Sequence, residues 1–218
     1  MSTVFLAGAS RGVGLEIATR LAQQKIPTIA LLRRPQPEIE ALGIQVRSGD
    51  AMNPDDVMAA MAGETIETVI STIGGISPEG VRSDFVGNRN LIDAALNVGV
   101  QHFILVTSLG TGDSAIALPE SALQALGAVL KEKNLAEQHL LESGLTYTIV
   151  RPGGLKSEPA TGNGVLTIDP SIGGIIHRPD VAELICRCVN NPKSHNRTFG
   201  AVDCTMVYGE REISEFTL

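Results

Sequence analysis

Three glycines near the start of the chain, Gly8, Gly12 and Gly14, have the spacing of a loop that binds a pyrophosphate. Glycines at such positions allow a tight turn and a close approach of the backbone to the anion. A hydrophobic run at 3–7 precedes this glycine loop, and a helical pattern over 13–22 follows it. A helix that begins there directs its free N–H groups and its dipole toward the phosphates. The order strand, loop, helix therefore predicts a dinucleotide-binding site. The loop residues expected to contact the phosphates are Gly8, Ser10, Arg11, Gly12 and Val13.

Two arginines, Arg33 and Arg34, follow the second hydrophobic run, where many NAD-binding domains carry an acidic residue. A carboxylate at this position repels a 2′-phosphate, whereas a guanidinium matches its charge and can donate two parallel hydrogen bonds to it. The arginines therefore predict NADP(H) rather than NAD(H), with Arg11 approaching the same phosphate from the glycine loop. The alternative is that Arg33 and Arg34 are solvated surface charges.

Runs rich in β-branched residues alternate with helical patterns along the whole chain. The runs lie at 3–7, 28–32, 44–47, 68–71, 103–107 and 146–150, and helices are expected at 13–22, 54–62, 84–98, 126–143 and 179–191. The runs are almost continuously apolar, as in parallel strands that are covered on both faces. The pattern predicts an α/β fold, a single Rossmann-type domain over 1–218 with a doubly wound, mostly parallel sheet flanked by helices.

Three segments, 74–83, 109–121 and 153–178, lack clear periodicity and are rich in glycine, serine and proline. Each follows a predicted parallel strand, so each is expected at the carboxyl edge of the sheet, where open α/β sheets bind ligands. We interpret them as substrate-side loops. The alternative is that they are ordinary connections, although loops of this length in a small domain are more often functional.

The composition excludes several other classes of function. A net charge of −7 argues against a nucleic-acid partner, and the apolar runs are shorter than the roughly 20 residues that a membrane span needs. Three cysteines, an odd number without a recognisable leader, are expected to be buried thiols in a cytoplasmic protein. No histidines or cysteines have metal-ligand spacing, so no metal is predicted. We expect a small-molecule partner and a monomer or small homo-oligomer.

Later motifs give the chain a family resemblance. The segments that carry it are Ser48-Gly49-Asp50-Ala51, Ser71-Thr72-Ile73-Gly74, Val106-Thr107-Ser108, Lys133-x-x-Ala136-Glu137 and Arg151-Pro152-Gly153-Gly154. With the glycine loop, they resemble an atypical short-chain dehydrogenase/reductase of the NmrA-like, NAD(P)H-binding branch, which includes flavin and biliverdin-IXβ reductases. The resemblance implies further cofactor contacts. These are Asp50 and Ala51 near the adenine, Thr72, Ile73 and Gly74 beside the cofactor, and Ser108, Lys133, Pro152, Gly153 and Gly154 near the nicotinamide.

One position departs from the family pattern. Conventional members carry a catalytic tyrosine four residues before the lysine, and here that position is Val129, which cannot transfer a proton. Ser108 and Lys133 remain as catalytic candidates: Ser108 as a hydrogen-bond donor and Lys133 as a ligand of the nicotinamide ribose. Alternatively, Ser108 only ends its strand and Lys133 is a solvated helix charge.

Two functions are compatible with this sequence. The first is an NADPH-dependent oxidoreductase that reduces a conjugated acceptor, such as a flavin, a quinone or a linear tetrapyrrole, which can take hydride without an enzymic tyrosine acid. The second is a non-catalytic NADP(H)-binding redox sensor or assembly factor, which the valine at position 129 favours.

Overall fold

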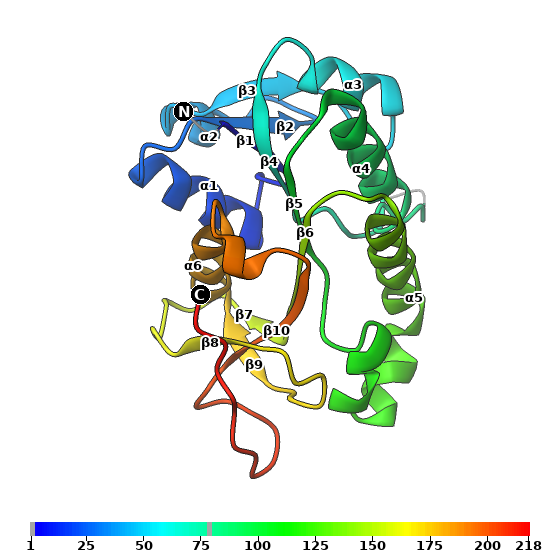
Figure 1. Cartoon of the computed structure of the whole chain (residues 1–218), viewed down its shortest axis with the longest axis vertical. Helices are drawn as coiled ribbons and strands as arrows, with labels where there is room; N and C mark the ends of the chain where they lie inside the picture. The colour runs from blue at the N-terminus through cyan, green and yellow to red at the C-terminus, as the bar shows by residue number, and fades with distance from the viewer. Residues whose placement is uncertain (1–2, 78–79) are drawn as a thin grey trace.

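A central sheet of eight strands forms the middle layer of the molecule, in the order β3-β2-β1-β4-β5-β6-β10-β8 (Figure 1). The computed structural model describes residues 3–77 and 80–218. The strands are β1 (Thr3–Ala7), β2 (Thr28–Leu32), β3 (Gln45–Ser48), β4 (Ile66–Ser71), β5 (His102–Val106), β6 (Tyr147–Pro152), β8 (Gly164–Thr167) and β10 (Arg197–Asp203). The first seven strands in this order are all parallel to one another, and the last strand, β8, pairs antiparallel with β10. The predicted doubly wound, mostly parallel sheet in a single domain is confirmed.

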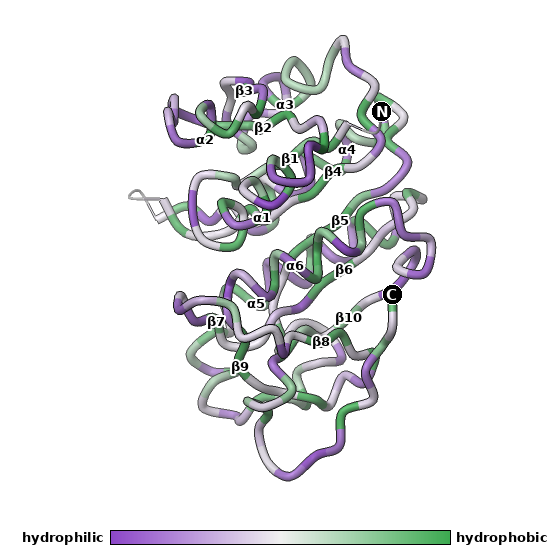
Figure 2. Tube along the Cα trace, turned by 90° about the vertical axis from the view of Figure 1, so that its left-hand side faces the viewer, coloured by the Kyte–Doolittle hydropathy of each residue, from purple (hydrophilic) through white to green (hydrophobic). Residues whose placement is uncertain are grey.

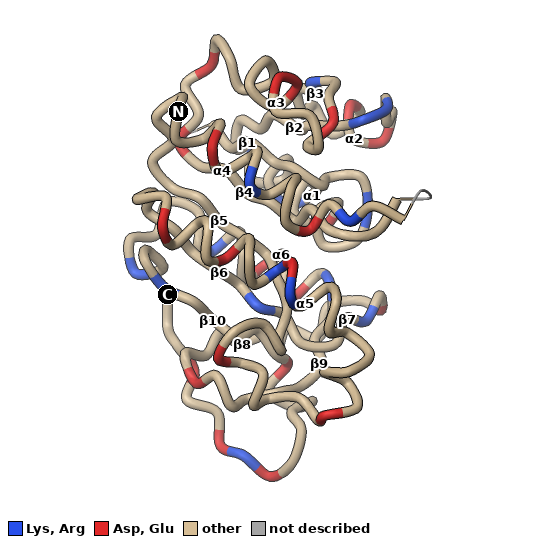
Figure 3. The backbone as a smooth tube through the Cα atoms, turned by 90° about the vertical axis from the view of Figure 1, so that its right-hand side faces the viewer, with Lys and Arg blue, Asp and Glu red and all other residues tan. Residues whose placement is uncertain are grey.

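Helices cover both faces of the sheet. They are α1 (Gly12–Gln23), α2 (Pro37–Ala41), α3 (Pro54–Met61), α4 (Val86–Val98), α5 (Glu120–Glu142) and α6 (Arg178–Cys188). Apolar residues of α1, α2 and α6 form one buried cluster with the sheet, and those of α3, α4 and α5 form a second on the other face. Hydrophobic residues accordingly concentrate along the central strands (Figure 2), while charged residues lie mainly on helices and connections (Figure 3).

Local signals in the sequence account for several helix boundaries. The side chain of Asn53 accepts a hydrogen bond from the N–H of Asp55, 3.0 Å away, and Pro54 takes the first position of α3. Gly99 ends α4 in the left-handed conformation, with φ of 76°. These signals fix where α3 begins and where α4 ends.

The segment 153–178 differs most from the expectation of an irregular loop. It contains β8 and a separate two-stranded parallel sheet, formed by β7 (Gly154–Lys156) and β9 (Ile175–His177). The strands have three or four residues, too few to show a period in the sequence. Strand β10, which the sequence did not predict, pairs with both β6 and β8.

The other two expected loops are only partly irregular. A 3₁₀ helix at Gly112–Ala117 occupies the middle of 109–121, and α5 begins six residues earlier than expected, at Glu120. Its first turns are mostly exposed, so they lack the one-sided apolar pattern by which a helix is recognised. Within 74–83, positions 78 and 79 lie outside the described residues.

The cysteines are only partly as expected. Cys186 and Cys188 are buried, and burial raises the pKa of each thiol to about 12, which keeps both protonated and unreactive. Cys204 is exposed, contrary to the expectation, because it follows the end of β10. Over residues 3–77 and 80–218, no helix combines the length and the apolar character of a membrane span.

Candidate functional site

The glycine loop connects β1 to α1 with almost no space to spare. Gly8 and Gly12 adopt positive φ angles of 94° and 56°, which favour glycine. A Cβ added to Gly14 would lie 2.0 Å from the carbonyl oxygen of Gly8, and one on Gly8 would lie 2.4 Å from the hydroxyl of Thr72. The Thr72 hydroxyl donates hydrogen bonds to the carbonyls of Ala7 and Gly8. Helix α1, the loop and the end of β4 therefore pack backbone against backbone.

The N-terminus of α1 is open to an anion. The N-cap residue Arg11 makes no capping hydrogen bond with its side chain, and the first turn contains no acidic residue. Ser10 and Arg11 are exposed, whereas Val13 is buried beneath the helix. The first N–H groups of α1 therefore have no side-chain partner in the described structure, and a phosphate can accept hydrogen bonds from them.

Basic side chains surround this helix end. A Cβ on Gly12 would lie 3.5 Å from the Nε of Arg178, and one on Gly75 would lie 3.8 Å from an Nη of Arg11. Arg33 and Arg34 follow β2 directly and are exposed, in the basic segment between β2 and α2 (Figure 3). Neither forms an ion pair with a described residue. In a chain with a net charge of −7, these guanidiniums supply local positive charge beside the loop.

The turn after β3 is built by Asp50. Its carboxylate accepts the N–H of Met52 at 3.0 Å, and its own N–H donates to Asp56 at 2.9 Å. The next residue, Ala51, is buried, and its carbonyl accepts a hydrogen bond from the side chain of Asn90. The two residues expected near the adenine thus hold a rigid turn at the same edge of the sheet as the glycine loop.

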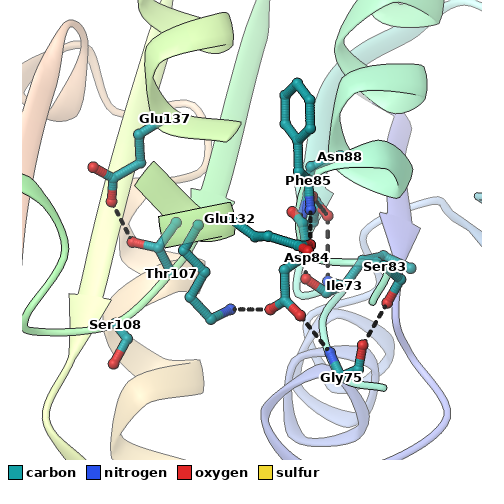
Figure 4. Close-up of polar contacts among 12 residues, drawn as sticks. Ile73, Gly75, Ser83, Asp84, Phe85, Asn88, Thr107, Ser108, Glu132 and Glu137 are labelled. Atoms are coloured by element: carbon teal, nitrogen blue, oxygen red, sulfur yellow. Dashed lines mark hydrogen bonds and ion pairs between the residues drawn. The ribbon is translucent and has the colours of Figure 1, made fainter. Parts of the chain in front are cut away.

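Lys133 is held by a buried carboxylate. Its Nζ lies 3.0 Å from Oδ1 of Asp84, whose side chain is 0% exposed, while the Lys133 side chain is 15% exposed. The other carboxylate oxygen of Asp84 accepts the N–H of Gly75 at 3.0 Å (Figure 4). A Cβ on Gly74 would lie 2.6 Å from Asp84 and 3.1 Å from Lys133. Lys133 is therefore not a solvated helix charge, but one half of an ion pair against Gly74.

Helix α4 holds Ile73 and Asp84 on their other side. The side chain of Asn88 donates to the carbonyls of Ile73 and Asp84, at 3.2 and 2.7 Å, and Ser71 donates to Asn88 at 2.5 Å. The N–H of Ile73 donates in turn to the hydroxyl of Ser71. The three cofactor candidates at 72–74 therefore lie together, in one hydrogen-bonded turn beside the glycine loop.

A second buried ion pair lies behind Ser108. The hydroxyl of Thr107 donates to Glu137 at 2.6 Å (Figure 4), and Arg151 donates to both oxygens of Glu137, at 3.0 and 2.7 Å. Burial disfavours the charge of Arg151, but hydrogen bonds and charges of Glu137 and then Asp113 outweigh it and raise the pKa of the guanidinium. The Ser108 hydroxyl donates only to the adjacent carbonyl of Leu109, at 2.9 Å. Ser108 is half-buried, and the bonds of Thr107 and Arg151 to Glu137 hold the strand end beside it in place.

Close backbone contacts fix the remaining candidates, at the end of β6. Pro152 is buried, and the N–H of Gly153 donates to Ala201 on β10 at 2.9 Å. A Cβ on Gly153 would lie 2.2 Å from the carbonyl oxygen of Gly174, whereas Gly154 is exposed. The candidates after β1, β4, β5 and β6 thus occupy one edge of the sheet.

The sequence reasoning did not assign Asp84, Thr107, Glu137 and Arg151. Glu137 and Arg151 lie inside the motifs that carry the family resemblance, and that is the signal by which they could have been found. In the sequence, Asp84 marks only the start of a predicted helix, and its pairing across 49 positions with Lys133 has no local sequence signal.

A family model described as NAD(P)H-binding matches residues 8–192, which include the glycine loop, Lys133 and the end of β6. The chain belongs to the NAD(P)H-binding family. In line with the predicted resemblance, its similar proteins include reductases and epimerase-like proteins of Rossmann fold.

Three relatives illustrate the range of this family. The structure of ChuY, an anaerobilin reductase from Escherichia coli O157:H7, has 35% sequence identity and a TM-score of 0.84, covering 93% of this chain and 98% of that one. The uncharacterized sugar epimerase YhfK of Bacillus subtilis is 31% identical, covering 90% of this chain and 92% of YhfK. Protein TIC 62 of Pisum sativum, a chloroplastic protein, is 34% identical over 87% of this chain but only 40% of its own length. The chain thus spans less than half of the TIC 62 proteins that it matches.

Proposed function

We propose that this protein is an NADPH-dependent reductase of a conjugated acceptor, such as a flavin, a quinone or a linear tetrapyrrole. The observation that carries the proposal is the uncapped N-terminus of α1, packed so tightly on the glycine loop that a Cβ on Gly14 would overlap the Gly8 carbonyl. This geometry suits a pyrophosphate, because backbone N–H groups rather than side chains face the anion.

The proposed cofactor contacts follow the edge of the sheet. N–H groups from Ser10 to Val13 bind the pyrophosphate, Arg33 and Arg34 bind the 2′-phosphate, and the turn at Asp50 and Ala51 borders the adenine. Thr72, Ile73 and Gly74 lie beside the ribose and pyrophosphate, with Arg11 nearby. Lys133 hydrogen-bonds the nicotinamide ribose, and Pro152, Gly153 and Gly154 border the nicotinamide. A free guanidinium at the end of β2 favours NADP(H), since it can pair with two phosphate oxygens.

NADPH bound at this edge supplies a hydride. The residues around it orient the reactants: Lys133 keeps its position through the buried Asp84, and Ser108 can turn its hydroxyl from the Leu109 carbonyl toward a ligand. Val129 offers no proton where conventional relatives have tyrosine. A conjugated acceptor suits such a site, because hydride adds to one atom and charge spreads to others before a proton arrives.

The three substrate-side segments support an acceptor with apolar faces. Each exposes a large apolar side chain: Ile76 in 74–83 is 60% exposed, Ile116 in 109–121 is 69% exposed, and Leu155 in 153–178 is 41% exposed. Ligand sites in proteins are lined mainly by such side chains, with few polar groups. ChuY, a relative over almost its whole length, is an anaerobilin reductase, which supports a reductase and leaves the acceptor to experiment.

The test is a panel of acceptors with purified protein. NADPH and NADH affinities are measured by fluorescence titration, and NADPH oxidation is followed with FMN, a quinone and a biliverdin. Steady oxidation with one acceptor, and stronger binding of NADPH than of NADH, are expected. Tight NADPH binding without turnover of any acceptor would refute the reductase.

The second candidate function, a redox sensor or assembly factor, is favoured by the absence of a proton donor at Val129. A sensor must bind NADPH and NADP⁺ with different affinities, since a ligand shifts an equilibrium only through differential affinity. Titration of both forms, with the oligomeric state measured alongside, tests it. Equal affinities and an unchanged oligomeric state would exclude sensing.

A further inference from the structure

Three chain segments that are distant in sequence meet beside the end of β6. The N–H of Gly154 donates to the carbonyl of Gly174 at 2.9 Å, and the N–H of Tyr208 donates to the carbonyl of Gly173 at 2.8 Å. The N–H of Ile175 donates to Met206 at 3.0 Å, so the chain at 206–208 runs antiparallel to 173–175. The C-terminal part of the chain is thereby attached to the segment expected beside the nicotinamide.

The ring of Tyr208 lies across this glycine surface. A Cβ on Gly173 would lie 3.0 Å from Cδ2 of the ring, and a Cβ on Gly154 would lie 3.6 Å from the hydroxyl oxygen. The hydroxyl end of the ring therefore lies next to Gly154. Tyr208 is 44% exposed, and its hydroxyl makes no hydrogen bond within the described residues. A phenol in this position can donate to a ligand.

The same surface continues to Ser108. Val207, directly before Tyr208, packs on a small buried cluster that contains Leu109 and Ile172. Leu109 follows Ser108, and its N–H donates to the carbonyl of Pro152 at 2.9 Å. Tyr208 is thus placed by the strand ends of β5 and β6, and not by a free loop.

We propose that the Tyr208 hydroxyl is the proton donor to the bound acceptor, a catalytic role that rests on the reductase function proposed above. The hydroxyl of Tyr208 lies beside Gly154, next to the proposed place of the nicotinamide at the end of β6. Lys133, on α5, approaches the site from the side of Gly74. The phenol is therefore near the acceptor atoms that receive the hydride, and it can supply a proton to a nitrogen or oxygen of the same conjugated system.

The step balances in atoms and electrons. The C–H bond of the reduced nicotinamide breaks, and its electron pair and hydrogen form a new C–H bond on the acceptor. The O–H bond of Tyr208 breaks, and its proton forms an N–H or O–H bond at a nitrogen or oxygen of the conjugated system. Solvent returns a proton to the phenolate, which is accessible because the side chain is 44% exposed. The acceptor is reduced by two electrons and NADPH is oxidised to NADP⁺.

The experiment compares Tyr208→Phe with Tyr147→Phe. Tyr147 is the only other tyrosine and begins β6, at the opposite edge of the sheet. With the best acceptor of the panel, Tyr208→Phe is expected to lower kcat/KM by about 100-fold or more, the usual contribution of a general acid. Small acids added to the buffer restore part of that rate. NADPH affinity stays unchanged, and the absorption spectrum of the acceptor bound with NADP⁺ shifts. Tyr147→Phe changes none of these.

Three outcomes separate the hypotheses. Wild-type protein that binds NADPH and oxidises it with no acceptor refutes the reductase itself, and the role of Tyr208 with it. An active wild type with an equally active Tyr208→Phe refutes the proton donor alone. A slower Tyr208→Phe that no acid restores, with an unshifted acceptor spectrum, assigns the ring a purely structural role and overturns the proposal.

Discussion

Replacing Gly14 by alanine tests the close packing on which the cofactor site depends. The added Cβ would lie 2.0 Å from the carbonyl oxygen of Gly8 and 2.7 Å from the hydroxyl of Thr72. Carbon and oxygen in contact are ordinarily about 3.3 Å apart or more. Helix α1 must therefore move away from β1, because the Gly8 carbonyl is a backbone group that cannot rotate aside as the end of a side chain can. Overpacking costs about 1–3 kcal/mol, and occasionally more. We expect about 3 kcal/mol here, or a melting temperature about 6–12 °C lower for a chain of this size.

The assay combines thermal unfolding with NADPH titration, and the chain offers a matched control. Gly127 lies inside α5, and a Cβ added there would meet no atom within 4 Å. Gly127→Ala is expected to stabilise the protein by about 0.5–1 kcal/mol, because alanine loses less entropy in a helix, and to leave NADPH affinity unchanged. Gly14→Ala should also weaken NADPH at least about tenfold, the loss of one charge-assisted hydrogen bond. A Gly14→Ala protein with wild-type stability and NADPH affinity would refute the reasoning.

Three further predictions concern charges. Arg33→Ala should weaken NADPH by about 1.5–3 kcal/mol, or about 10- to 150-fold, and leave NADH unchanged; equal losses in a paired titration would contradict a 2′-phosphate contact. Glu137→Gln should destabilise the protein by about 3 kcal/mol in urea unfolding, because it leaves the buried Arg151 without its main partner; a loss below about 1 kcal/mol would contradict this. Burial, and then nearby His195, lower the pKa of His102 to about 4, so the unfolded chain binds more protons below its own pKa of about 6.5. Stability should therefore fall by about 2 kcal/mol from pH 7 to pH 5, and His102→Gln should remove that part of the pH dependence.

Local sequence determined most of the sheet. The six predicted strands all form, with ends within two residues of the expected ones, because each is a short apolar run between loop residues. Strands β8 and β10 escaped prediction for a physical reason. Thr167 and Gly200 are paired neighbours, yet they lie 33 positions apart, and β8 has only four residues. Such an edge is defined by tertiary pairing rather than by any local period.

The glycine loop was also readable from the sequence, because its geometry depends on residues within seven positions of each other. The contacts that hold the other site residues in place could not be predicted from the sequence. Asp84 reaches Lys133 across 49 positions, and Tyr208 reaches Gly154 across 54. A sequence shows which side chains can carry charge or donate a proton. Only the folded chain brings two of them into contact, and here those contacts decide which groups are free for a ligand.

Helix α5 bears on the choice between reductase and sensor. Lys133 and Glu137 are four residues apart and hence neighbours on one face of the helix. Lys133 pairs with Asp84 beyond β4, and Glu137 binds Arg151 on β6, so two buried charge pairs fix α5 on both sides of β5. Breaking either pair would leave a buried charge without its partner, at a cost of several kcal/mol. A sensor needs an element with two accessible conformations. The two charge pairs oppose a second conformation at this edge of the sheet. A rigid edge that holds Ser108 between fixed neighbours is what a catalyst requires, and this favours the reductase.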